Sequence, residues 1–260
     1  MSGSPEPGEP KATEASKAPV VRVPAGVLAS YAVFDRGAGR VVLEREARRT
    51  FRSASVVKIL IAVDYLERHR ASAADRASLA SMLRSSDDQA ATEFWRRGGR
   101  GKIIERMVRR VGLAETAPPP AEKPGFWGYT ALSARDVVKT YRYLLEAAPG
   151  EFVMEQLRRS TPCGKDGFDQ TFGIPRAVKG PRAVKQGWSG FGDVPAEPCG
   201  GGVRPAAWGP GLGIGRPVLH TTGVVGDKIV VVLTLQSAGT SFRTAAARIT
   251  ALTRDVYRTV

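Results

Sequence analysis

The sequence predicts an α+β fold in which one antiparallel sheet is formed by the N-terminal and C-terminal segments of the chain. Runs of β-forming residues occur at Val27–Phe34 and Arg40–Glu44, and again beyond residue 180. Between them, from Arg76 to Ala148, apolar residues recur at helical spacing. Strands near both ends with helices between them indicate a sheet flanked by helices, with an inserted all-α subdomain.

Length and composition are those of a globular protein with a sizeable core. The chain has 260 residues, of which 42% are hydrophobic, and no apolar run is long enough to span a bilayer. Residues 1–26 are rich in proline and charge without apolar periodicity, so we expect a disordered linker or tail there. One domain would then occupy residues 27–260, with an α/β part at 27–70 and 160–260 and a helical part at 71–159.

The formal net charge of +14 would attract polyanions, but the basic residues are scattered and no aromatic-interleaved basic motif occurs, so nucleic-acid binding is not expected. Cys163 and Cys199 lack metal-site spacing, and His69 and His220 lie far apart, so we expect no metal and no cofactor. A Cys163–Cys199 disulfide is expected if the protein is exported, and two buried free thiols are the alternative.

The N-terminal tail bears on localisation. It shows no apolar segment typical of a signal peptide. The same tail would remain after removal of a secretory or lipoprotein leader, so we expect an extracytoplasmic or secreted protein, and a cytoplasmic location stays open.

The first elements predict a hairpin followed by a central helix. The turn Asp35–Gly39 joins the two N-terminal strands. The segment Ser55–Arg70 carries apolar residues on every side, which is typical of a buried helix. Helices are then predicted at Asp87–Arg97, Lys102–Val111 and Ser133–Ala147, the last with Ser133 and Asp136 as a capping-box-style start.

The remaining elements predict a functional loop and the second half of the sheet. Ala114–Thr130 is rich in proline and glycine, and a loop of that length within a compact region is often functional. The later elements are a helix at Glu151–Arg159, strands at Arg182–Trp188, Pro217–Val225 and Lys228–Leu235, and a helix at Phe242–Tyr257. Gly226-Asp227 marks a tight turn between the last two strands.

The first motif with chemical content is Ser55-Val56-Val57-Lys58. Residues three apart share a helix face, so the Ser55 hydroxyl and the Lys58 amine can meet. A serine needs a base to become a nucleophile, and burial of a lysine favours its neutral form. A helix N-terminus at Ser55 would also offer free N–H groups to an oxyanion. The alternative is a capping serine followed by a surface lysine.

Two further motifs follow in order. Ser86-Asp87-Asp88 stands at the start of a predicted helix, where an N-cap with acidic residues in the first turn is the ordinary explanation. Lys185-Gln186-Gly187-Trp188 lies on a predicted strand, where its alternative is an ordinary strand with an edge glycine.

Together the three motifs resemble the S-x-x-K, S-D-N and K-T-G set of class A β-lactamases and penicillin-binding proteins. The resemblance covers the chain from about residue 27 to the C-terminus and implies a β-lactamase/transpeptidase-like catalytic domain. It implies that Ser55 is acylated and that Lys58 accepts the proton of Ser55. Ser86 would relay a proton to the leaving nitrogen, and Lys185 would lower the pKa of the Ser86 relay. The N–H groups of Ser55 and Trp188 would form the oxyanion hole.

The substrate-binding positions implied by the resemblance depart from the family pattern. They are Asp88, Gln186, Gly187, Trp188 and Ser189. Asp88 stands where the family has an asparagine, and its carboxylate cannot donate to a substrate carbonyl. Gln186 stands where the family has a hydroxyl residue that helps hold a substrate carboxylate, and the hydroxyl of Ser189 is a candidate to take over that contact. Gly187 lets the strand approach the substrate closely. Trp127, Tyr129 and Trp188 are candidates for an aromatic wall, and His220 either lines the site or is structural.

The long loop lacks the E-x-x-L-N motif with which class A β-lactamases place a deacylation base. Glu115 and Glu122 are its only carboxylates, and solvated loop acids are the alternative for both. We therefore expect a β-lactamase-like serine hydrolase with slow deacylation, acting as a monomer on a small β-lactam or related amide. A D,D-peptidase, esterase or acyltransferase working on a peptide such as a cell-wall component is one alternative. A non-catalytic penicillin-recognising sensor is the other.

Overall fold

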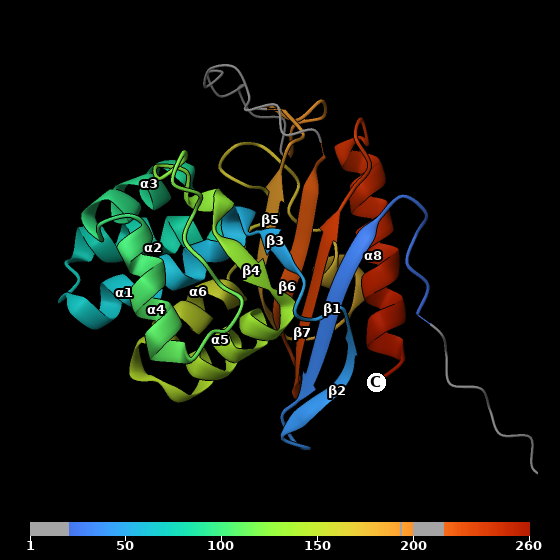
Figure 1. Cartoon of the computed structure of the whole chain (residues 1–260), viewed down its shortest axis with the longest axis horizontal. Helices are drawn as coiled ribbons and strands as arrows, with labels where there is room; N and C mark the ends of the chain where they lie inside the picture. The colour runs from blue at the N-terminus through green and yellow to red at the C-terminus, as the bar shows by residue number, and fades with distance from the viewer. Residues whose placement is uncertain (1–20, 193, 200–215) are drawn as a thin grey trace, which may run out of the picture.

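A five-stranded antiparallel sheet forms the centre of the molecule (Figure 1). The computed structural model describes residues 21–192, 194–199 and 216–260. The strand order is β2-β1-β7-β6-β5. The strands are β1 (Leu28–Asp35), β2 (Arg40–Arg45), β5 (Arg182–Ser189), β6 (Val218–Val225) and β7 (Lys228–Leu235). Because N-terminal β1 pairs with C-terminal β7 along its whole length, the predicted sheet of distant segments is confirmed.

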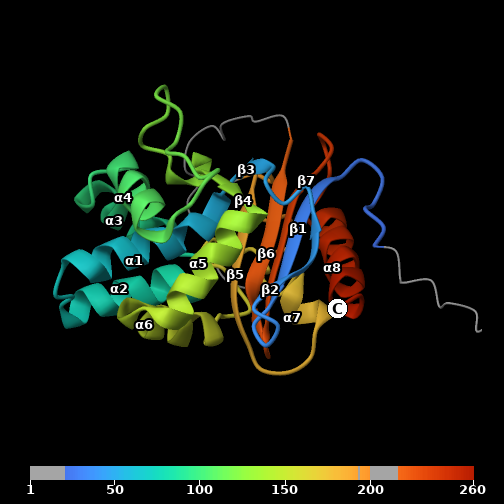
Figure 2. The same cartoon turned by 60° about the horizontal axis from the view of Figure 1, so that its bottom comes forward.

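Helices cover both faces of this sheet (Figures 1 and 2). One face carries α7 (Ile174–Ala177) and α8 (Phe242–Arg258). The helical subdomain and its neighbours lie on the other face and comprise α1 (Lys58–Arg68), α2 (Ala73–Arg84), α3 (Asp88–Arg97), α4 (Gly101–Val111), α5 (Ala134–Glu146) and α6 (Ala148–Arg158). The α+β fold with an inserted all-α part is thus confirmed.

Each face of the sheet has its own apolar core, as the alternation of side chains along a strand requires. In β7, Val231 belongs to the core beneath the helical subdomain, whereas Val230 and Val232 belong to the core beneath α8. Helix α1 is buried at every residue from Lys58 to Tyr65, which agrees with its apolar sequence. A catalytic group on α1 therefore lies inside the molecule rather than on its surface.

The segment predicted as one helix from Ser55 to Arg70 begins as a different structure. Residues Ala54–Val57 form a 3-10 turn, η1, and the α-helix starts at Lys58. Side chains at i and i+3 eclipse in a 3-10 turn, so this geometry aligns Ser55 with Lys58 more closely than an α-helix would.

A second, two-stranded sheet was not predicted. Strand β3 (Thr50–Arg52) pairs with β4 (Ala131–Ser133), and Ser53 N continues the contact by donating to Thr130 O at 2.8 Å. The prediction of a wholly helical region from Arg76 to Ala148, interrupted only by the loop Ala114–Thr130, is therefore wrong at β4. Three residues are too few to show strand alternation. This sheet fastens the end of the long loop to the segment that leads into Ser55.

The cysteines are joined, so the alternative of two free thiols is excluded. Their Cα atoms lie 5.6 Å apart, and the bond ties the loop after α6 to the segment after β5.

The predicted tail is described only in part, since residues 1–20 lie outside the described residues. Val21 and Val23 pack against the core beneath α8, so residues 21–26 differ from the tail that composition predicts. Within the described ranges, no helix combines the length and the apolar character needed to cross a membrane.

Candidate active site

Ser55 and Lys58 form the first contact of the candidate site. Lys58 Nζ donates to Ser55 Oγ at 2.9 Å, and the lysine side chain is fully buried. Ala54, immediately before the serine, has φ of 45°, which is uncommon for a residue with a Cβ. Such backbone strain persists where the surroundings fix it, and it often accompanies functional residues.

Ser86 stands between two lysines. Lys58 Nζ donates to Ser86 O at 2.6 Å, and Lys185 Nζ donates to Ser86 Oγ. Ser86 itself has φ of 54° in the short link between α2 and α3, which turns its carbonyl toward one lysine and its hydroxyl toward the other. A chain of contacts therefore links Ser55, Lys58, Ser86 and Lys185, passing through the carbonyl of Ser86 on one side and its hydroxyl on the other.

Lys185 is buried at the far end of this chain. Burial lowers the pKa of its amine well below the ordinary value, and the nearby charge of Lys58 lowers it further. An amine with a depressed pKa releases its proton to a neighbour such as the Ser86 hydroxyl more readily than an ordinary lysine does. This is a property that a proton relay needs.

Asp87 and Asp88 have separate roles at the start of α3. Asp87 is the N-cap and accepts from Gln89 N at 3.0 Å and Ala90 N at 3.1 Å, as the capping alternative predicts. Asp88 instead accepts from Lys58 Nζ at 2.5 Å, and its side chain remains 62% exposed. The carboxylate thus lies at the mouth of the site with one oxygen on the buried amine.

The side chains of β5 divide between its two faces. Gln186 Nε2 donates to Phe172 O and to Gln170 O, and the Trp188 ring packs in the core beneath α8. The alternation of the strand therefore turns both side chains away from the Lys185 face. Ser189 lies half-buried at the end of the strand, where its carbonyl accepts from Arg52.

Gly187 brings the backbone of β5 against the nucleophile segment. A Cβ on this residue would lie 3.1 Å from Ser53 O and 3.3 Å from Ser55 N. A side chain would displace one of the two segments, so glycine sets the distance between Ser55 and the strand.

Two residues near the site carried no recognisable sequence signal. Gln170 accepts from Ser86 Oγ at 3.3 Å and is fixed by donating to Arg84 O at 2.6 Å. Asp166 accepts from Trp188 Nε1 at 2.9 Å. Burial raises the pKa of the Asp166 carboxyl, and the charge of Asp88 raises it further, while Lys58 opposes this. Both residues lie in the irregular segment before α7, which has no periodicity to read.

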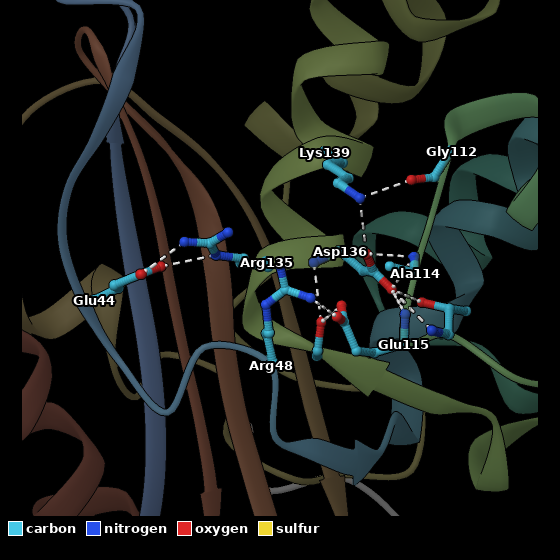
Figure 3. Close-up of polar contacts among 10 residues, drawn as sticks. Glu44, Arg48, Gly112, Ala114, Glu115, Arg135, Asp136 and Lys139 are labelled. Carbon is cyan, nitrogen blue, oxygen red and sulfur yellow. Dashed lines mark hydrogen bonds and ion pairs between the residues drawn. The ribbon is translucent and has the colours of Figure 1, made fainter.

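The structure places neither loop carboxylate in this chain of contacts. Glu115 accepts from Arg48 at 3.0 Å and from Ser133 Oγ at 3.1 Å, beside the Asp136 network (Figure 3). Glu122 is exposed on the loop. Among the described contacts, none joins either residue to Ser55, Lys58 or Ser86.

His220 lies opposite Gly187 on the neighbouring strand, β6. Its Nδ1 accepts from Thr234 N at 3.2 Å, so the proton of the neutral ring is on Nε2, which contacts Arg52 O at 2.9 Å. Burial lowers the pKa of the imidazole to about 4. Both ring nitrogens are therefore satisfied by backbone, as a structural histidine requires.

This histidine should make stability depend on pH. Its folded pKa lies below the unfolded value of about 6.5, so its contribution is complete above that pH and is lost as the pH falls toward 4. We expect the free energy of unfolding to fall by up to about 3 kcal/mol over this interval. Denaturant titrations at several pH values should show a smaller fall for His220→Gln, whereas His69→Gln, at an exposed position, should match the parent. An equal fall in His220→Gln would contradict this assignment.

Comparisons with known proteins agree with this fold. The structure matches a class A β-lactamase from Mycobacterium abscessus with a TM-score of 0.63 and 17% identity, over 90% of this chain and 94% of that one. It matches PBP-A with a TM-score of 0.62 and 15% identity, over 92% and 91% of the two chains. The chain therefore has the fold of the serine β-lactamase and penicillin-binding-protein superfamily, and the resemblance stated from its motifs is confirmed at this level.

A sequence relative places the chain within a narrower group. It is 34% identical over 248 residues to the protein named "Putative lipoprotein LppW" from Mycobacterium tuberculosis, covering 89% of this chain and 70% of the relative. The same identity and coverage hold for LppW from Mycobacterium bovis. The chain belongs to the LppW family. No protein-family model matches it.

Proposed function

We propose that this protein is a serine acyl-transfer enzyme that forms an acyl-enzyme on Ser55 with a β-lactam or a related amide. The observation that carries the proposal is the set of contacts that links Ser55 to Lys58, Lys58 to the Ser86 carbonyl, and Lys185 to the Ser86 hydroxyl. A capping serine and a surface lysine would not produce it, because Lys58 and Lys185 are both buried and both contact Ser86.

The contact chain supports a balanced acylation step. Ser55 Oγ gives its proton to the neutral amine of Lys58 as the oxygen bonds to the carbonyl carbon. The carbon–nitrogen bond then breaks, and Ser86 Oγ supplies the proton that the leaving nitrogen takes. A protonated Lys185 replaces that proton, so the step moves one positive charge from Lys185 to Lys58 and the total charge of the site is unchanged. The backbone N–H groups of Ser55 and Trp188 are the candidate oxyanion donors, and Gly187 permits their close approach.

The substrate side of the site differs from that of an efficient β-lactamase. Gln186 is turned away by the strand, which leaves Lys185 and Ser189 as candidate groups for a substrate carboxylate. The exposed oxygen of Asp88 accepts hydrogen bonds and favours a substrate N–H over a carbonyl. These features favour an amide or peptide acyl donor as strongly as a β-lactam, so a D,D-peptidase, esterase or acyltransferase is the second candidate.

A long-lived acyl-enzyme also fits the penicillin-recognising sensor. Glu115 is engaged with Arg48 and Ser133, and Glu122 is exposed, so neither supports fast deacylation. A location outside the cytoplasm agrees with the Cys163–Cys199 disulfide and with the name of the relative, and it would give access to cell-wall components.

Intact-protein mass spectrometry over time tests the proposal. The protein is incubated with benzylpenicillin, a fluorescent penicillin and an activated ester, and the labelled peptide is mapped. We expect one acyl group on Ser55, persisting for minutes or longer, and no label in Ser55→Ala. Label on another residue, or undiminished label in Ser55→Ala, would refute the assignment. Rapid turnover without accumulation would instead identify an efficient hydrolase.

A further inference from the structure

The ring of Trp127 lies directly against the amine of Lys58. Lys58 Nζ is 4.6 Å from the ring centroid, which is within cation–π range. A water molecule between the two would need about 3 Å to the amine and about 3.5 Å to the ring. The observed separation leaves no room for it.

The other directions around Lys58 Nζ are also occupied. The amine has three hydrogen-bonding positions whether it is charged or neutral, and here they meet Ser55 Oγ, Ser86 O and Asp88 Oδ1. With the Trp127 ring beside it and no exposure to solvent, the amine has no free position at which to hold a hydrolytic water.

The position of Trp127 is fixed from both sides of the site. Its Nε1 donates to Thr92 Oγ1 at 3.2 Å, on the same helix as Asp88. Its carbonyl and that of Gly128 lie within 3.5 Å of Ser53 Oγ, two residues before the nucleophile. Trp127 thus bridges α3, through its ring, and Ser53 at the start of η1, through its backbone, and the small β3–β4 sheet secures the end of its loop.

We propose that Trp127 is a positioning residue that keeps water from the acyl group on Ser55 and so determines the lifetime of the acyl-enzyme. The proposal rests on the proposed function. Hydrolysis requires water oxygen to bond to the acyl carbon while a base takes its proton, after which the ester bond to Ser55 Oγ breaks and the serine recovers a proton. Trp127 excludes the water from Lys58, the one amine that contacts Ser55 Oγ among the described residues.

The experiment compares variants at this position by the decay of the acyl-enzyme. Trp127→Ala opens space beside Lys58 and should shorten the acyl-enzyme half-life about tenfold or more, which is about 1.4 kcal/mol in the barrier. Trp127→Phe keeps an aromatic face and should stay within about threefold of the parent. Thr92→Val, which removes only the indole acceptor, is the matched control and should behave as Trp127→Phe does.

A partition measurement separates this role from loss of structure. With hydroxylamine as competing nucleophile, we expect Trp127→Ala to shift products from the hydroxamate toward the hydrolysed acid. Trp127→Leu provides a second test if the alanine variant does not fold. A folded Trp127→Ala or Trp127→Leu with parental half-life and partition would overturn this inference alone. Failure of every acyl donor to label Ser55 in the parent would overturn the proposed function and this inference with it.

Discussion

Replacing Lys58 with methionine is expected to slow acylation of Ser55 by about 10²–10⁴-fold, the usual contribution of a positioned general base. Methionine is also long and unbranched, so it fills the buried channel that the lysine stem occupies. The Lys58 amine contacts Ser55 Oγ at 2.9 Å and holds Ser86 through its carbonyl. The rate is measured as the appearance of the acyl-enzyme by mass spectrometry at increasing acyl-donor concentration.

Two further variants show whether the amine acts as a base or only as a charge. Lys58→Arg keeps a cation beside Asp88 but cannot accept a proton, so it should be about as slow as Lys58→Met. Asp88→Asn keeps the amine and removes the carboxylate at its 2.5 Å contact, so it should retain acylation. Parental rates in Lys58→Arg would show that Lys58 supplies charge alone.

Spacing and apolar pattern carried the most predictive information about this site. The apolar surroundings of Lys58 in the sequence indicated a buried amine, and the i, i+3 interval placed it beside Ser55 whether the turn is α or 3-10. The sheet of distant segments followed from β-forming runs on either side of helical ones. These features depend on local periodicity, which a single sequence displays.

Features that depend on tertiary contact were not predictable. The direction in which the Gln186 side chain points depends on which face of β5 meets the helical subdomain. The strand is buried on both faces and each face mixes apolar and polar residues, so its sequence does not distinguish them. The approach of Trp127 to Lys58 requires the β3–β4 pairing, whose strands have three residues each. Asp166 reaches the site through an irregular loop, so only the fold brings it near Asp88 and Lys58.

The loop that carries Trp127 is held at its start by a buried carboxylate. Asp136 is fully buried at the start of α5, and its side chain accepts from the backbone N–H groups of Ala114, Glu115 and Thr116 (Figure 3). The sequence predicted it as half of a capping box with Ser133. Ser133 Oγ does accept from Asp136 N at 3.1 Å, but the carboxylate turns to the loop instead.

Asp136→Ala is therefore expected to lower the free energy of unfolding by about 3–5 kcal/mol, because it leaves three backbone N–H groups and the Thr116 hydroxyl without their acceptor. Asp136→Asn keeps an acceptor oxygen and should cost less. Glu44→Gln is the matched control, since its ion pair with Arg135 is more than one-third exposed on both sides and should be worth under about 1 kcal/mol. Denaturant titration measures all three variants.

The same variants connect the loop to the acyl-enzyme. If Asp136 fixes the loop that positions Trp127, then folded Asp136→Asn should show a shorter acyl-enzyme half-life than the parent, whereas Glu44→Gln should not. This comparison is made under conditions in which both variants are more than about 95% folded, so that unfolded protein does not contribute to the measured decay of the acyl-enzyme. A destabilised Asp136→Asn with a parental half-life would show that the start of the loop supports the fold without controlling Trp127.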